Sequence, residues 1–101
     1  MFGKRRNTNE LEPPPVSSEN EQAVEILRVW AAPGGSQELT LRPLWKDPGA
    51  WGLLLADIAG HAANAYESEG GNRDVALMRI REALEAEWSN PTDVPKDITP
   101  P

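Results

Sequence analysis

Residues 24–42 decide the fold and read Val-Glu-Ile-Leu-Arg-Val-Trp-Ala-Ala-Pro-Gly-Gly-Ser-Gln-Glu-Leu-Thr-Leu-Arg. The first nine residues are rich in β-branched and aromatic side chains with partial alternation, which is typical of a strand. Residues 33–36 have the chemistry of a turn, because glycine adopts positive φ at little cost. Residues 38–42 alternate cleanly between polar and apolar side chains and predict a second strand. Together these features predict a β-hairpin.

The register of this hairpin determines which side chains share a face. If the numbers of paired residues add up to 70, one face is wholly apolar: Leu27, Val29, Ala31, Leu39, Leu41 and Pro43. The other face then carries Ile26, Arg28, Trp30, Thr40 and Arg42. A sum of 69, which a two-glycine loop would give, mixes the two sets. We therefore predict the even register, with Arg28 opposite Arg42 and a longer or bulged turn around residues 34–36.

Two helices are predicted after the hairpin. Asp47-Pro48 is a typical helix start, since aspartate is a favoured N-cap and proline is favoured at the first helical position. Helical spacing then continues to about residue 67 through Trp51, Leu54, Leu55, Ile58, Ala62, Ala65 and Tyr66. Gly70-Gly71 ends this helix and Asn72 can cap a second one over residues 73–88. The apolar stripe of the second helix consists of Leu77, Ile80, Leu84 and Trp88.

The predicted fold class is therefore α+β, a β-hairpin followed by two α-helices packed on one sheet face (ββαα). Seven of the 10 prolines lie outside this unit, at positions 13–15, 91, 95, 100 and 101. The composition of these ends buries too little apolar surface to offset the entropy lost on ordering. We expect a disordered tail at residues 1–21, a single domain at residues 22–90 and a disordered tail at residues 91–101.

Composition and charge exclude several classes of protein. No apolar run approaches the roughly 18 residues of a membrane span, and the 101 residues include no cysteine for a disulfide or a thiolate. The basic triplet at residues 4–6 is not followed by an apolar segment, so we predict no secretion signal and a cytoplasmic location. The formal net charge of −6 argues against a nucleic-acid-binding protein, which usually has a basic footprint.

Residues with catalytic chemistry are scarce in this sequence. His61 is the one histidine, and Asp57 precedes it by one helical turn. This spacing suits two metal ligands on a helix, or a carboxylate that orients a general base. No third ligand is evident and no motif places a nucleophile or a phosphate-binding loop, so a solvated polar face is the preferred interpretation. We predict a non-enzymatic protein with no catalytic residue, metal site or cofactor.

The candidate binding residues lie on the outer face of the hairpin. Arg28, Trp30 and Arg42 can grip a partner protein, stack a base or bind a small anion. Trp45 stands just before the first helix and can line a groove. Because two arginines in an acidic chain are a weak match for nucleic acid, we predict a protein–protein interaction surface. The alternatives are a solvated face and nucleic-acid or small-anion binding at Arg28, Trp30 and Arg42.

The predicted core is small for an independent fold. A two-stranded sheet is marginally stable alone, and the helices cover only one of its faces. Pairing the hairpins of two chains would give a homodimer around a two-fold axis, whereas in a monomer residues 11–16 would cover the second face. Gly52, Ala56 and Gly60 recur every four positions along the first helix. They indicate either close packing within the chain or a helix contact between protomers.

Three stretches of the sequence resemble a known family. They are residues 27–35, residues 45–66 and residues 87–93, and the distinctive run is Trp-Lys-Asp-Pro-Gly-Ala-Trp at residues 45–51. They are similar to a small family of uncharacterised bacterial proteins described only as a domain of unknown function. The resemblance implies a bacterial cytosolic domain of this size. It brings no activity, cofactor or catalytic residue.

Overall fold

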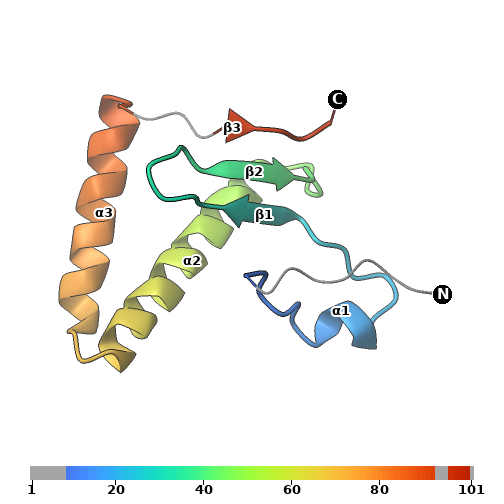
Figure 1. Ribbon diagram of the computed structural model, residues 1–101, viewed down its shortest axis with the longest axis horizontal. Coiled ribbons are helices and arrows are strands. Elements are labelled where there is room, and N and C mark those ends of the chain that lie inside the picture. The colour runs from blue at the N-terminus through green and yellow to red at the C-terminus, as the bar shows by residue number, and fades with distance from the viewer. Residues whose placement is uncertain (1–8, 93–95, 101) are drawn as a thin grey trace.

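The structure is a computed structural model that describes residues 9–92 and 96–100 (Figure 1). The basic triplet at residues 4–6 lies outside the described residues. The elements are, in order, α1 (Val16–Glu19), β1 (Leu27–Trp30), β2 (Glu38–Leu41), α2 (Gly49–Ser68), α3 (Arg73–Ser89) and β3 (Lys96–Asp97). The predicted hairpin and the two long helices after it are confirmed, and with them the α+β class.

β1 and β2 pair antiparallel, with Arg28 opposite Thr40 and Trp30 opposite Glu38. Paired numbers add up to 68, so the register is even, as predicted, but every partner is shifted by two residues. A shift of two preserves the faces, and the apolar face still holds Leu27, Val29, Leu39 and Leu41. The predicted Arg28–Arg42 pair is wrong, because the Arg42 amide donates to the Ile26 carbonyl at 2.8 Å.

The turn explains the shift in register. The Gly35 amide donates to the Ala32 carbonyl at 3.1 Å, which closes a four-residue turn with Pro33 and Gly34 at its centre. Gly34 has φ +75°, and proline followed by a glycine with positive φ is the pattern of a type II turn. The loop between the strands is centred on Gly34, one residue earlier in the chain than we predicted. The strands consequently pair two positions out of the predicted register.

A third strand, β3, joins the sheet from the C-terminal segment. It runs parallel to β2, and the strand order is β1-β2-β3. The Ile98 amide donates to the Leu39 carbonyl at 3.1 Å, and the Leu41 amide donates to the Thr99 hydroxyl at 2.9 Å. We expected disorder over residues 91–101, but residues 96–100 lie along β2. Alternate backbone groups of β2 point away from β1, and the C-terminal segment bonds them.

α2 and α3 form a helical hairpin joined by residues 69–72. Gly70 has φ +101° at the end of α2. The Asn72 side chain accepts a hydrogen bond from the Val75 amide at 3.0 Å, as expected of the N-cap of α3. The Arg73 Nε donates to Asn64 Oδ1 at 2.7 Å and ties the start of α3 to α2. Among the described residues, neither of these helices nor α1 combines the length and apolar character needed to cross a membrane.

Only part of the predicted helix packing is present. In the described part of the chain, α3 comes within 8 Å, Cα to Cα, of α2 and of no other element. Figure 1 shows α3 standing beside the hairpin, with the first turns of α2 drawn behind the strands. By the same measure α2 approaches neither strand of the hairpin, so the two helices lie closer to each other than either lies to the sheet. Ala63 is the one described apolar residue that is fully buried.

Replacing Asn72 by alanine removes the oxygen that accepts the Val75 amide hydrogen. We expect the free energy of unfolding to fall by about 1 kcal/mol, since this is the usual cost of losing an N-cap. Urea unfolding followed by circular dichroism measures the change. Asn72→Ser is the matched control, because serine keeps an oxygen at this position. Equal stability of Asn72→Ala and the unsubstituted chain would contradict the assignment of the cap.

Candidate functional site

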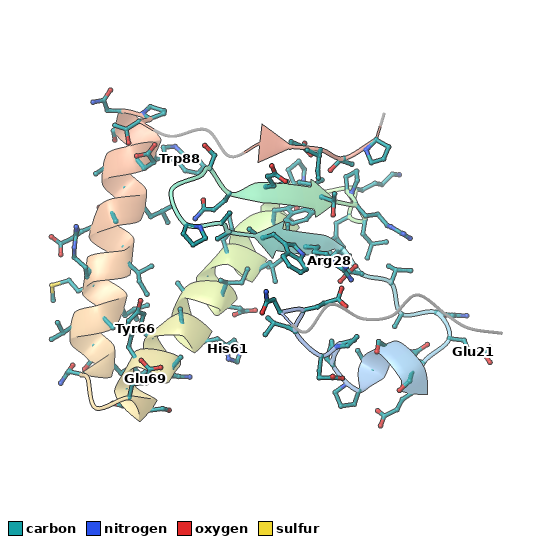
Figure 2. The ribbon with its side chains drawn as sticks, viewed as in Figure 1. Glu21, Arg28, His61, Tyr66, Glu69 and Trp88 are labelled. Carbon is teal, nitrogen blue, oxygen red and sulfur yellow. The ribbon has the colours of Figure 1, made fainter. Side chains whose placement is uncertain are left out.

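Arg28 is the centre of an ion-pair cluster on β1 (Figure 2). Its Nη1 lies 2.7 Å from Glu10 Oε2, and its Nη2 lies 3.1 Å from Glu25 Oε1. The hydrogen bonds and charge of Glu25, with a smaller contribution from Glu10, raise the pKa of Arg28. β1 places the guanidinium on the outer face, the segment before β1 brings Glu25, and the N-terminal segment brings Glu10. The cation predicted to grip a partner is therefore already paired within the chain.

Two open hollows flank Arg28 on the outer face of the sheet. One has a volume of about 200 Å³ and is lined by Arg28, Trp30, Glu38, Leu39, Thr40 and Ile98. The other, also about 200 Å³, brings Arg42 together with Arg28, Thr40 and Thr99. The structure thus gathers three of the four predicted binding residues on one face. Sequence reasoning missed Ile98 and Thr99, because nothing in the C-terminal segment signals that it pairs with β2.

Trp45 lies elsewhere, in the loop between β2 and α2. Its ring packs edge to face on Trp51, with ring centroids 5.4 Å apart and planes at 75°. It lines neither of the hollows beside Arg28. Trp51 belongs to the first turn of α2 and is half-buried. Trp45 is therefore placed to fix the start of α2, and the structure does not bring it to the face that carries Trp30.

The free edge of β1 borders a larger hollow of about 590 Å³. Residues 9–14 line one side of it, and the other side is formed by Glu25 and residues 27–31. Because the Ile26 carbonyl bonds the Arg42 amide, the backbone groups of Leu27 and Val29 point away from β2. β1 ends the sheet, so among the described residues these groups have no strand partner. An edge of this kind is a template for pairing with another chain.

The acid–base candidates on α2 do not assemble into a site. Asp57 and His61 are both exposed, and Figure 2 shows His61 on the side of α2 away from α3. Asn64 accepts a hydrogen bond from Arg73 at the start of α3. Over residues 9–92 and 96–100, no group of three or more His, Cys, Asp or Glu side chains is arranged to hold a metal ion.

Comparison with known proteins gives the family. Residues 10–92 match a family described as "Domain of unknown function (DUF5076)". The chain belongs to the DUF5076 family. The resemblance drawn from the sequence to a family of unknown function is thereby confirmed.

The solved structures that resemble this DUF5076 chain include one that matches most of its length. It comes from the photosynthetic bacterium Rhodopseudomonas palustrus CGA009 and is described as a "putative pyruvate dehydrogenase". The two chains are 42% identical, the match covers 93% of each, and the TM-score is 0.67. No curated protein matches the chain.

The titration of Asp97 tests the local conformation of the C-terminal segment, whose Thr99 lines the hollow that contains Arg42. The Thr99 hydroxyl and the Thr99 amide, the latter at 2.8 Å, bond the Asp97 carboxylate and lower the pKa of Asp97. A carboxylate whose pKa is lower in the folded chain than in the unfolded chain stabilises the fold at pH values above the unfolded-state pKa. This stabilisation is lost as the pH falls through the folded-state pKa. We expect an NMR pH series to show Asp97 titrating below ordinary aspartate, and closer to ordinary aspartate in Thr99→Val.

Thr99→Ser is the control for this measurement, because it keeps the hydroxyl and should keep the lowered pKa of Asp97. An Asp97 titration that is the same in Thr99→Val and in the unsubstituted chain would show that the hydroxyl bond is not formed.

Proposed function

We propose that this DUF5076 protein is a non-enzymatic protein–protein interaction module whose fold is completed by contact with another protein chain. The observation that carries the proposal is the extent of its surface. The chain exposes 9120 Å², whereas a compact monomer of 11.1 kDa exposes about 5700 Å². Its radius of gyration is 16.1 Å, against about 13 Å for a compact domain of 100 residues.

Many large apolar side chains are part of the exposed surface. The exposed large apolar side chains include Leu53, Leu55, Ile58 and Tyr66 on α2, and Val75, Met78, Leu84 and Trp88 on α3. Complete burial of one such side chain stabilises a protein by about 1.5–3 kcal/mol. Monomeric proteins rarely leave large contiguous apolar patches in water. A partner that covers several of these side chains would supply the burial that the chain lacks by itself.

The hairpin offers one surface for such a contact. The outward backbone groups of Leu27 and Val29 are available at the edge of β1, and the side chains of Val29 and Trp30 are exposed. An extended segment of another protein can add to a sheet edge of this kind. Pairing of two β1 edges would produce the hairpin-based homodimer predicted from the sequence.

Binding of a small anion or of nucleic acid is the second candidate, and it rests on the hollow that contains Arg28, Arg42, Thr40 and Thr99. Guanidinium groups and hydroxyls suit a phosphate. An incoming anion would have to displace two carboxylates from Arg28, which weighs against this function. Steep loss of binding with added salt would favour nucleic acid, since phosphate contacts release counterions.

The description of the Rhodopseudomonas structure refers to an enzyme, and that description applies to that protein. In this chain both members of the candidate acid–base pair, Asp57 and His61, are exposed. Nothing in their placement supports transfer of an activity, and the proposal gives these residues no catalytic role.

The dependence of stability on protein concentration tests the proposed function. If a second copy completes the fold, the urea midpoint should rise between two concentrations about a hundredfold apart, because association stabilises by mass action. Circular dichroism gives the midpoint, and hydrogen exchange gives the protection of α3. A constant midpoint with weakly protected α3 amides would support a different protein partner. A constant midpoint with α3 protected as well as the most stable part of the chain would overturn the proposal.

A further inference from the structure

The apolar stripe of α3 is covered at only one end. Leu77, Ile80, Leu84 and Trp88 are spaced i, i+3, i+7 and i+11 and so share one side of the helix. Leu77 and Ile80, nearest the turn that joins α2 to α3, are half-buried. Leu84 is 51% exposed and Trp88 is 78% exposed. On a single helix face, exposure therefore rises with distance from the turn.

The facing side of α2 follows the same trend. Near the turn, Ala63 is buried and Gly60 is half-buried, with the Arg73 guanidinium 3.7 Å from where a Cβ of Gly60 would lie. Ala56 and Gly52 continue this side of the helix at intervals of four residues, and both are exposed. A Cβ added at Gly52 would meet no atom within 4 Å. This side of α2 is therefore also uncovered far from the turn.

The two uncovered regions lie at the same distance along their helices from the turn that joins α2 to α3. Ala56 is 12 residues before the last residue of α2, and Leu84 is 11 residues after the first residue of α3. At 1.5 Å per residue, each is about 17 Å from the turn. Figure 1 shows the two helices meeting at the turn and diverging away from it, and Figure 2 places Trp88 on the side of α3 that faces the hairpin.

We propose that a second copy of this chain covers the inner surface, defined as Gly52 and Ala56 of α2 with Leu84 and Trp88 of α3. Leu84 and Trp88 of each copy pack on Gly52 and Ala56 of the other copy, around a two-fold axis. The inference rests on the proposed function and names its partner.

The inner surface is complementary to itself. α3 contributes two large projecting side chains, and α2 contributes a glycine and an alanine, which permit close approach of another helix. A contact around a two-fold axis requires a surface of this kind, because each copy must offer both halves of the fit. The large side chains of a second copy can pack on the small residues of the first copy. The small residues of the second copy can in turn receive the large side chains of the first copy. A different partner would have to reproduce both features.

A stable dimer requires an interface of sufficient area. The chain as a whole, with its N- and C-terminal segments, exposes about 3400 Å² more than a compact monomer, and the inner surface is one part of this excess. A standard interface removes about 800 Å² from each partner, and the interfaces of permanent homodimers are larger and more apolar. A contact centred on Leu84 and Trp88 has the apolar character of this second class.

Sedimentation equilibrium at micromolar concentration tests the inference, and a mass near twice 11.1 kDa is expected. Gly52→Leu should weaken the dimer at least about tenfold, because leucine occupies the space that receives the other copy. A Cβ at this position meets no atom within 4 Å in the monomer, and leucine is a better helix former than glycine, so the monomer should still fold. Leu84→Gln should also weaken the dimer. Met78→Gln is its matched control, because Met78 is 62% exposed on α3 and lies off the stripe.

Engineered cysteines identify the contact directly, since the chain has none of its own. A chain carrying Ala56→Cys, mixed with a chain carrying Leu84→Cys, should form a covalent heterodimer on mild oxidation. Disulfide formation requires Cα atoms within about 7 Å, so the bond reports the two helices packed together. A single chain carrying both substitutions should form its bonds between copies. A disulfide within a monomer would mean that α3 closes on its own α2, and it would overturn both this inference and the proposed function.

The hairpin edge is the competing surface for a second copy. Val29→Pro blocks pairing at that edge, and the outward-pointing amide of Val29 makes proline tolerable within the sheet. A dimer abolished by Val29→Pro but unaffected by Gly52→Leu and Leu84→Gln would overturn the inference and leave the proposed function standing. A monomer with weakly protected α3 amides would do the same, because another protein would then be the partner.

Discussion

α2 has more apolar surface than the described part of the chain covers, and the exposure of the helical hairpin follows from this constraint. Near its start, Trp51 and Leu54 are half-buried, and near its end Ala63 is buried beside α3. These two covered sides point in different directions, because the side chains of a helix turn by about 100° per residue. Ile58 and Tyr66 stay 43% and 59% exposed. Among the described residues, no neighbour covers this side of α2 completely.

The sequence predicts those features of the fold that local chemistry determines. Alternating side chains give both faces of the hairpin, and Asn72 gives the start of α3. The pairing itself depends on the geometry of the turn at Pro33 and Gly34, which shifts every partner by two residues without changing the faces. β3 escapes prediction for a related reason, since two residues in a proline-rich segment have no periodicity and its position is set by the edge of β2.

The candidate site shows the same division between local and long-range effects. Arg28 and Trp30 are identifiable on the outer face from alternation alone, whereas Glu10 reaches Arg28 from 18 positions away in the chain. Helical periodicity likewise identifies the stripe of Leu77, Ile80, Leu84 and Trp88 but does not say what covers it. The expectation that this stripe packs within the chain holds near the turn and fails beyond it. A periodic pattern specifies an apolar face of a helix. Which element packs on that face depends on the length and path of the neighbouring elements.

The two exposed surfaces differ in a way that suits different kinds of contact. The inner surface of α2 and α3 has no charged member, and large apolar interfaces of this type are characteristic of permanent association. The hollows beside β1 are bordered by Arg28, Glu25 and Thr40. The interfaces of non-obligate complexes are more polar than those of permanent homodimers. If the helices of two copies cover each other, the edge of β1 stays available in each. The dimer would then be the folded unit, and the hairpin would be the surface through which it meets other molecules.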